Sequence, residues 1–336
     1  MLQEKFMKQR VFHIPVFVPH KGCPHDCVFC NQRKITGQIE EMTQAKARSI
    51  IDSHLETIEK YNDRGTYYAE IAFFGGSFTA IDRESMHELL SLAHGYVLSG
   101  RVGGVRCSTR PDCIDDEVLA LCKSYGMTAI ELGVQSADDE VLIASNRGHT
   151  FEDVTKAAKL IKSYGMELGL QMMTGLPGDT PAKSIETAKK IASLSPDSVR
   201  IYPTLVMEGT HLALMHQSGA YTAQTLDEAV ELAAELVSIF KARGITILRI
   251  GLQTTDGVNA STVKGPYHNA FAELVYGRVW RSKIESDIIA RSLHDTTYEI
   301  DAPSGKISQI IGHKKENAEY FKRKYNIILK LNNTKS

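Results

Sequence analysis

The sequence predicts an α/β protein in which parallel strands alternate with helices. Short apolar segments alternate with helical segments over residues 10–250, and Tyr-Gly-Met occurs twice where a helix ends before a strand. Parallel strands joined by right-handed crossovers form either a barrel or an open sheet. A barrel is favoured because glycines and polar residues directly follow the expected strands, and barrels place their sites at that end of the strands.

The expected strands are short and apolar, and they lie at residues 11–18, 70–74, 105–108, 128–133, 167–173 and 198–202. Pro15 makes the first of them an edge strand. Helical periodicity and end signals predict the intervening helices at residues 43–61, 83–96, 114–125, 138–145, 151–164 and 181–194. A long amphipathic helix at 226–243, a strand at 245–250 and a helix within 266–280 follow.

Composition is that of an ordinary globular protein. The 336 residues suffice for one large domain or two smaller ones, and the net charge of −1 offers no bulk field for a polyanion, so any nucleic-acid contact must be local. Residues 1–10 are charged and no apolar run reaches membrane-spanning length, so we expect a cytoplasmic protein. In that reducing compartment Cys107, Cys113 and Cys122 are expected as free thiols.

Three of the six cysteines, Cys23, Cys27 and Cys30, lie on one short segment after the first expected strand. Thiolates at this spacing select soft metals, and three of them leave one iron of a four-iron cluster open to another ligand. The alternative is a structural zinc site completed by His25 or His20, because zinc closes its shell with four ligands. The segment by itself does not separate the two metals.

Several glycines and polar residues follow the other expected strands. They are Gly75-Gly76, Thr109-Arg110-Pro111-Asp112, Gln135-Ser136 and Gly175-Leu-Pro-Gly178. Glycines allow close approach of a ligand to the backbone, although tight packing explains them equally well, and arginines bind carboxylates or merely pair with surface acids. Glu131 lies within an apolar strand and therefore needs a partner.

The order of these features resembles the radical S-adenosylmethionine (radical SAM) superfamily. Residues 109–112 (TRPD), 131–136 (ELGVQS), 146–149 (NRGH) and 200–206 (RIYPTLV) resemble the radical domain of the Elongator catalytic subunit, over about residues 10–280. The resemblance implies a partial (β/α)6 TIM-type barrel at residues 10–250. An α/β extension with a basic tail is expected at 251–336.

The resemblance also implies cofactors. Cys23, Cys27 and Cys30 would hold a [4Fe-4S] cluster whose open iron binds S-adenosylmethionine, which is cleaved to a 5′-deoxyadenosyl radical. An electron donor such as flavodoxin or ferredoxin is then required. Phe29 would pack near the cluster and adenine.

The same resemblance implies which residues bind S-adenosylmethionine. Gly75 and Gly76 would approach its amino group, and Gln135 and Arg147 its ribose and carboxylate. The adenine would lie against Gly175 to Gly178. Thr109 and Arg110 complete the expected set of cofactor-binding residues.

The chain departs from the Elongator subunit in two respects. Its first two cysteines are closer together, and about 56 residues follow Trp280, too few for an acetyltransferase domain. We therefore expect radical modification of a tRNA base resembling a wobble uridine. The alternatives are a small substrate such as a tetrapyrrole, as in oxygen-independent coproporphyrinogen oxidase, or a non-catalytic zinc protein that binds RNA.

Residues 307–317 resemble the helix pair of a KH domain, which clamps nucleic-acid backbone with a G-x-x-G turn. Here Gly312 is followed by His313-Lys314-Lys315, so the second glycine is missing. The surrounding tail is basic, since Lys314, Lys315, Lys322, Arg323, Lys324 and Lys330 outnumber Glu316 and Glu319. A solvated basic helix packed back on the barrel is favoured over an RNA contact.

Overall fold

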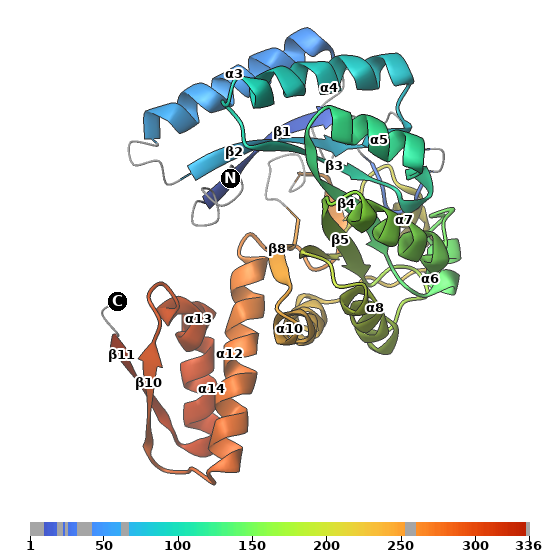
Figure 1. Ribbon diagram of the computed structural model, residues 1–336. Helices are drawn as coiled ribbons and strands as arrows, with labels where there is room; N and C mark the ends of the chain where they lie inside the picture. The colour runs from blue at the N-terminus through green and yellow to red at the C-terminus, as the bar shows by residue number, and fades with distance from the viewer. Residues whose placement is uncertain are drawn as a thin grey trace.

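The protein is a curled parallel sheet with helices on its outer face and a smaller lobe at the C-terminal end (Figure 1). The computed structural model describes residues 10–18, 23, 26–31, 42–61, 67–252 and 260–333. The main sheet has seven strands in the order β1-β2-β3-β4-β5-β6-β8, all paired in parallel. The strands are β1 (Arg10–Val18), β2 (Tyr67–Gly75), β3 (Gly104–Thr109), β4 (Met127–Gln135), β5 (Glu167–Thr174), β6 (Ser198–Pro203) and β8 (Thr246–Ile250).

This sheet confirms the predicted partial barrel, and the strand expected at 245–250 joins it as β8, next to β6. The strand order follows the chain order, so each crossover connects neighbouring strands and their carboxyl ends share one rim. Strands β1 and β8 form the two edges because the sheet does not close. The half-barrel therefore has an inner face and a lateral opening between these edges.

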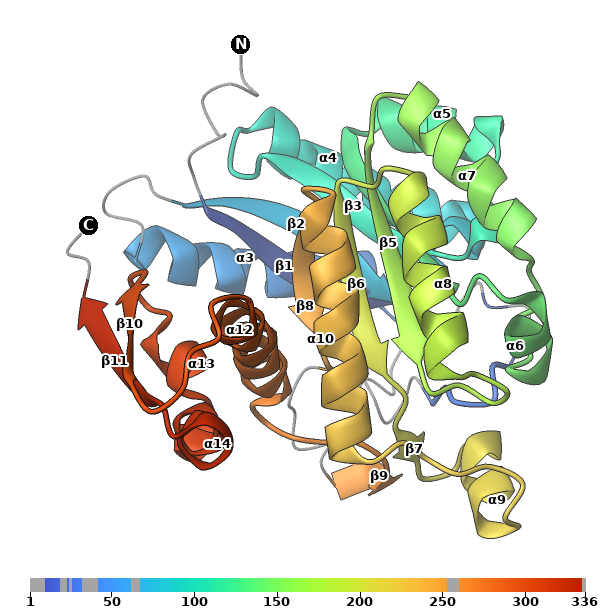
Figure 2. The ribbon, with the colours of Figure 1, turned by 90° about the horizontal axis from the view of Figure 1, so that it is seen from below.

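Helices cover the outer face of the sheet (Figures 1 and 2). They are α3 (Gln44–Tyr61), α4 (Arg83–Leu98), α5 (Asp116–Ser124), α6 (Asp139–Ala144), α7 (Phe151–Ser163), α8 (Pro181–Ser193) and α10 (Leu226–Ala242). Short 3-10 turns lie at Phe78–Ala80 and Pro111–Cys113. Local signals set the helix ends: the Thr43 hydroxyl accepts from the Lys46 amide, as an N-cap should, and Gly126 and Gly165 end helices with positive φ.

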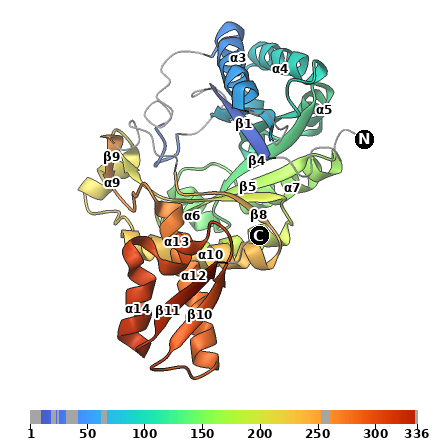
Figure 3. The ribbon, with the colours of Figure 1, turned by 90° about the vertical axis from the view of Figure 1, so that its left-hand side faces the viewer.

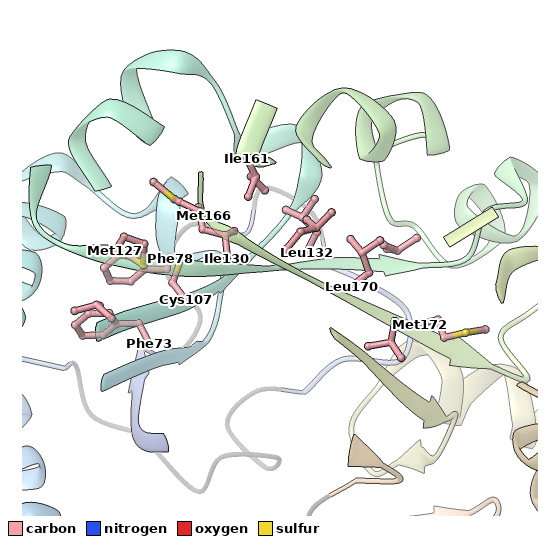
Figure 4. Close-up of a cluster of buried hydrophobic side chains, with 14 of the residues drawn as sticks. Phe73, Phe78, Cys107, Met127, Ile130, Leu132, Ile161, Met166, Leu170 and Met172 are labelled. Carbon is pink, nitrogen blue, oxygen red and sulfur yellow. The ribbon is translucent and has the colours of Figure 1, made fainter. Parts of the chain in front are cut away.

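The main core lies between the sheet and these helices. Figure 4 shows buried side chains from successive strands on this side, including Phe73, Cys107, Ile130 and Leu170. Phe73 stacks on Phe78 at 4.5 Å between ring centroids. Alternate strand residues point to the inner face instead, where side chains of the candidate site lie.

After β6 the chain forms a small cap near the strand ends. It consists of α9 (His211–Gln217) and an antiparallel pair, β7 (Val206–Met207) and β9 (Thr262–Lys264). Val206 and Leu212 of this cap pack with Val28 of the cysteine segment in a separate apolar cluster. The cap therefore helps to fix that segment against the barrel rim.

The C-terminal lobe begins within a long helix and ends at the last strand. Its elements are α12 (Phe271–Ala290), β10 (Thr297–Ala302), α13 (Ile307–Ile311), the turn His313–Lys315, α14 (Glu316–Tyr325) and β11 (Ile328–Asn333). Helix α12 joins two cores: Phe271 and Val275 pack in the main core, whereas Ile284 and Ile288 pack in a second apolar cluster inside the lobe.

The basic helix α14 was expected to pack back on the barrel, and the structure corrects that expectation. Its buried Phe321 lies in the lobe cluster with Ile284 of α12 and Ile327 before β11. Strands β10 and β11 pair in parallel and complete this small unit. The lobe lies beside the barrel and is connected to it through α12 (Figures 1 and 3).

Candidate functional site

The cysteine segment is held against the barrel rim by backbone hydrogen bonds. The Val28 amide donates to the Ser145 carbonyl at 3.2 Å, and the Leu212 amide donates to the Val28 carbonyl at 2.7 Å. The Cys30 amide donates to the Cys27 carbonyl at 3.0 Å, which closes a tight turn. The buried Val28 side chain therefore anchors a segment that presents Cys27 and Cys30 half-buried.

Arg147 connects this segment to the end of β4. Its Nη1 donates to the Cys27 Sγ at 3.2 Å and its Nη2 to the Gly133 carbonyl at 2.8 Å. The neighbouring Asn146 side chain donates to the Asp26 carbonyl at 2.9 Å. The structure thus brings together two residues that were predicted for the site from distant parts of the chain.

Arg110, at the end of β3, lies next to Arg147. Its Nε and Nη2 bind the Asp112 carboxylate at 2.9 and 3.0 Å, and Nη2 also donates to the Arg147 carbonyl. Burial lowers the pKa of the Arg110 guanidinium, but Asp112 more than offsets this, so the pKa is raised overall. Both arginines are positioned as fixed cations at the rim.

Each of these buried arginines keeps one nitrogen without a hydrogen-bond partner among the described residues: Nη1 of Arg110 and Nε of Arg147. The side chains are 2% and 7% exposed, so an unsatisfied donor there is costly. A carboxylate is the usual partner of such a fork. The two orphan donors are therefore unused hydrogen-bonding capacity at the ends of β3 and β4, of the kind that an anionic group satisfies.

The glycine pair after β2 packs against β1. Gly75 has φ +114°, and a Cβ there would lie 3.1 Å from the Val18 carbonyl oxygen. The Gly76 amide donates to the same oxygen at 3.0 Å. Next to the pair, the Ser77 Oγ lies 3.5 Å from the Cys23 Sγ. Gly75 is thus required by local packing, and Ser77 brings this end of β2 to the cysteine segment.

Thr109 and Gln135 end β3 and β4. The Thr109 hydroxyl lies 2.6 Å from the Thr79 hydroxyl, which donates to the Cys113 carbonyl at 2.7 Å, so Thr109 stabilises the rim from below. Gln135 adopts φ +65°, unusual for a residue with a side chain. Its Oε1 accepts from the Gln171 amide at 3.2 Å. This strained conformation turns a buried amide toward the inner face of the barrel.

The turn after β5 is built around Gly175 and Gly178, both with positive φ. A Cβ at Gly175 would lie 2.5 Å from the Gln224 side chain, and the Gly175 carbonyl accepts from the Tyr221 hydroxyl at 2.6 Å. Gly178 has open space around it. Neither glycine contacts the cysteine residues directly, but Tyr221 packs with Val28 and so connects the turn to the cysteine segment.

A buried charge layer crosses the inner face below the rim. Arg106 Nε binds Glu70 at 2.7 Å and its Nη1 binds Glu131 at 3.2 Å. Arg200 donates to both carboxylate oxygens of Glu131, from Nε at 2.5 Å and from Nη2 at 3.1 Å. The His13 Nε2 lies 3.3 Å from the Glu70 carboxylate. The prediction that Glu131 needs a partner is confirmed. The layer contains side chains from β1, β2, β3, β4 and β6 and ties the half-barrel together.

The two glutamates of this layer, Glu70 and Glu131, have lowered pKa values, which favour their ionised forms. Burial raises the pKa of Glu131, but Arg200 and Arg106 outweigh burial and the pKa is lowered overall. Glu70 behaves in the same way through His13 and Arg106. At the rim, burial together with Arg147 and Arg110 lowers the pKa of His149 to about 4, so this imidazole is neutral near pH 7.

The three cysteines provide the right donors for an iron–sulfur cluster, since soft thiolates are its usual ligands. Among the described residues, no three His, Cys, Asp or Glu side chains are already close enough together to hold a metal ion. The zinc alternative depended on His20 and His25, which lie outside the described residues. The donor chemistry of the three cysteines fits such a cluster, and Arg147 contacts one of the three sulfurs.

Sequence reasoning missed several residues of the rim. Ser77, Gln171 and Tyr221 contact the predicted residues, yet a serine, a glutamine and a tyrosine in ordinary contexts carry no local signal. His149 stood within the quoted NRGH motif without a role; its Nε2 donates to the Val134 carbonyl at 3.3 Å. Only the fold brings these side chains to the rim.

Comparison with known proteins identifies the family. Residues 17–191 match the Radical SAM superfamily, and residues 196–281 match the Radical_SAM C-terminal domain. An uncharacterized protein of Methanocaldococcus jannaschii is 32% identical over 68% of this chain and 70% of its own length. A tRNA uridine(34) acetyltransferase of the same organism is 32% identical over 67% of this chain and 48% of its own length.

Among solved structures, archaeal Methanocaldococcus infernus Elp3 with an N-terminal deletion is similar, with a TM-score of 0.64 and 25% identity. The match covers 83% of this chain and 63% of that structure. The chain spans about half the length of the tRNA uridine(34) acetyltransferases that it matches. In the part of the chain that the structure describes, no helix is long and apolar enough to cross a membrane. The chain belongs to the radical SAM superfamily and is an enzyme of that superfamily.

Proposed function

We propose that this enzyme binds a [4Fe-4S] cluster through Cys23, Cys27 and Cys30, cleaves S-adenosylmethionine reductively and modifies a base of RNA, a uridine of the wobble type in tRNA. The observation that carries the proposal is Arg147, which contacts the Cys27 sulfur and keeps a buried N–H without a partner among the described residues. A site for a thiolate-bound cluster and a site for a carboxylate therefore adjoin each other.

The chain's own groups then have distinct tasks. The orphan nitrogens of Arg147 and Arg110 bind the carboxylate of S-adenosylmethionine, and Gln135 donates from its amide to the ribose. Gly178, with open space around it, borders the adenine. When bound, the cluster supplies the electron that cleaves the sulfonium. Neutral His149 supports the rim without adding a cation beside the sulfonium.

The inner face beyond the charge layer suits a planar substrate. Phe17 and Phe74 lie 6.5 Å apart between ring centroids, and the Arg200 guanidinium lies 5.5 Å from the Phe74 ring. These two rings and Tyr202 are half-buried, so they offer aromatic surface inside the half-barrel. Nucleobases stack on aromatic side chains and guanidinium planes. This surface supports a base as the substrate.

The relatives support RNA as the substrate class. The similar archaeal proteins are named tRNA uridine(34) acetyltransferase, and mammalian relatives at 28% identity are named Elongator complex protein 3. The match covers about half of those proteins, so our proposal includes the radical reaction and leaves acetyl transfer aside.

The test is anaerobic reconstitution followed by analysis of iron, sulfide and zinc. The protein is then incubated with S-adenosylmethionine and dithionite, with and without tRNA, and 5′-deoxyadenosine is measured. Cys27→Ala is expected to lose the cluster and 5′-deoxyadenosine together. Cys122→Ala is the matched control, because that thiol lies buried on α5 away from the segment and should keep both.

Two outcomes would contradict the proposal. Stoichiometric zinc without iron would favour the zinc protein. Formation of 5′-deoxyadenosine that tRNA never alters, together with tight binding of a tetrapyrrole, would instead favour a small-molecule substrate.

A further inference from the structure

The C-terminal lobe has the order strand, helix, turn, helix, strand. β10 and β11 pair in parallel with Thr297 opposite Ile328, and helices α13 and α14 form the crossover between them. The residues that join the helices are Gly312 to Lys315, the segment that resembles the G-x-x-G turn of a KH domain. The fold therefore places this segment where such a turn lies, between two helices on one side of a small sheet.

The turn has a defined backbone conformation although its second glycine is absent. Gly312 has φ +83° and ψ 159°, and its carbonyl accepts from the Lys315 amide at 3.0 Å. Lys315 stands at the position of the missing glycine and adopts φ +68°, and Lys314 adopts φ +50°. Left-handed backbone is unfavourable for a residue with a Cβ, so each of these two consecutive lysines is strained. The lobe thus holds two strained lysines at an exposed turn.

A buried asparagine fixes the turn in this conformation. Asn317 is 1% exposed, and its Nδ2 donates to the Gly277 carbonyl at 2.8 Å and to the Ile310 carbonyl at 3.1 Å. Its Oδ1 accepts from Arg281 Nε at 2.8 Å. Since these bonds join α12, α13 and α14, the turn is preorganised before any ligand binds.

Exposed cations lie in the turn and in the last turn of α14. Four of them have no ion-pair partner within the described ranges: Lys314, Lys315, Lys322 and Arg323. By contrast, Lys324 pairs with Glu285 at 2.8 Å, and Lys330 pairs with Glu299 at 2.7 Å. We call the four unpaired cations the lobe cations. Unpaired Lys and Arg side chains in and after a preorganised turn can bind the phosphate groups of a nucleic acid.

The lobe lies next to the open side of the half-barrel. The His313 ring packs edge-on against His268 at 5.5 Å between ring centroids, and His268 belongs to a groove of about 460 Å³ along the edge strand β8. Figure 3 shows the lobe beside this edge. A strand of RNA on the lobe cations would therefore approach the opening through which a base can reach the inner face.

We propose that the C-terminal lobe binds the phosphate backbone of single-stranded RNA through the turn Gly312–Lys315 and the lobe cations. The role of this contact in presenting a base to the barrel rests on the proposed function, whereas RNA binding by the lobe does not. Because the whole chain has a net charge of −1, the electrostatic attraction of RNA to the protein has to come from the lobe cations.

The test measures binding of a short fluorescein-labelled single-stranded RNA of mixed sequence to the full chain, by anisotropy over a series of salt concentrations. The double variant Lys314→Gln/Lys315→Gln removes two phosphate contacts. For a single strand, each contact contributes about 0.7 to the slope of log K against log salt, so the slope should fall by about 1.4. Near 0.1 M salt this corresponds to a loss of affinity of about 25-fold.

The matched control is Lys159→Gln/Lys189→Gln, which changes the net charge equally at two exposed lysines of α7 and α8 outside the lobe. This control should retain the affinity and slope of the unchanged protein. Equal affinities and slopes for the two double variants would overturn the proposal. The single variant Lys315→Gly restores the second glycine; it should remove one contact and reduce the slope by about 0.7 while the lobe stays folded.

Failure of this proposal is distinguishable from failure of the proposed function. Binding of RNA by the Cys27→Ala protein, which should lack the cluster, would support the lobe contact whether or not radical chemistry occurs. Formation of 5′-deoxyadenosine with tRNA-dependent yield, but without any effect of the lobe variants on RNA affinity, would overturn the lobe contact alone.

Discussion

Replacing Glu131 by Gln would test whether the buried charge layer holds the half-barrel together. The Glu131 carboxylate accepts two bonds from Arg200 and one from Arg106, and its side chain is 5% exposed. Glutamine keeps the shape but removes the charge. Arg106 retains Glu70, whereas the other partners that the structure describes for Arg200, the Tyr202 hydroxyl at 3.5 Å and the Phe74 ring, are uncharged. The variant therefore leaves one buried guanidinium without a counter-charge.

Breaking a buried pair by removing one partner typically costs about 3–5 kcal/mol, because the remaining charge is uncompensated. Arg200 is only slightly exposed, at 12% of its side chain, so solvent can offset part of this cost. We expect the free energy of unfolding to fall by about 3 kcal/mol. The double variant Glu131→Gln/Arg200→Met should lose less than this, since no unpaired charge remains.

The assay is urea unfolding followed by circular dichroism and extrapolated to water. The matched control is Glu167→Gln: its carboxylate lies 3.6 Å from Arg106 but its side chain is 64% exposed, so the expected loss is below about 1 kcal/mol. A loss for Glu131→Gln no larger than that of the control would refute the reasoning.

The remaining predictions concern pH, the lobe turn and the rim. The pKa values of Glu70 and Glu131 are lowered below their ordinary 4.5, so their contribution to stability is present above about pH 4.5 and is lost as the pH falls through the lowered values. The melting temperature should therefore drop over this acidic range, and it should drop less in Glu131→Gln. Gly312→Ala should destabilise the lobe by about 2 kcal/mol or more, because a Cβ in this glycine-only conformation would lie 2.8 Å from the Asn317 backbone nitrogen. The control Gly305→Ala, at φ +71° in open space, should cost about 1 kcal/mol. Similar losses of unfolding free energy for the two variants in urea would contradict this prediction. Arg147→Lys should weaken S-adenosylmethionine binding by about tenfold in anaerobic calorimetry, because lysine cannot replace the fork of donors, and an unchanged Kd would remove Arg147 from the binding site.

Residues near one another in the sequence determined much that could be predicted. Apolar strands, helix caps and the glycines at helix ends are local signals, and the observed elements begin and end close to the expected positions. Placing polar residues after strands predicted a common rim, because parallel strands put their carboxyl ends together. The long helix α12 extends to Ala290, beyond the expected 280, since residues 281–290 contain no proline or glycine.

The C-terminal lobe could not be predicted in the same way. Strand β10 does alternate exposed Thr297, Glu299 and Asp301 with the more buried Tyr298, Ile300 and Ala302, but its partner β11 follows only after two helices that cross over between them. The sequence showed a basic helix and an incomplete glycine turn. The tertiary structure shows that both belong to a separate unit with its own apolar cluster.

The sequence by itself determined the donor set and the fold class: three soft thiolates on one segment, and alternating strands and helices that specify a parallel half-barrel. The tertiary structure decided which side chains meet. Arg147 reaches Cys27 across 120 positions of the chain, and Arg200 reaches Glu131 across 69. Strand register and loop packing set such contacts, and the local sequence carries no record of either because both depend on the whole sheet.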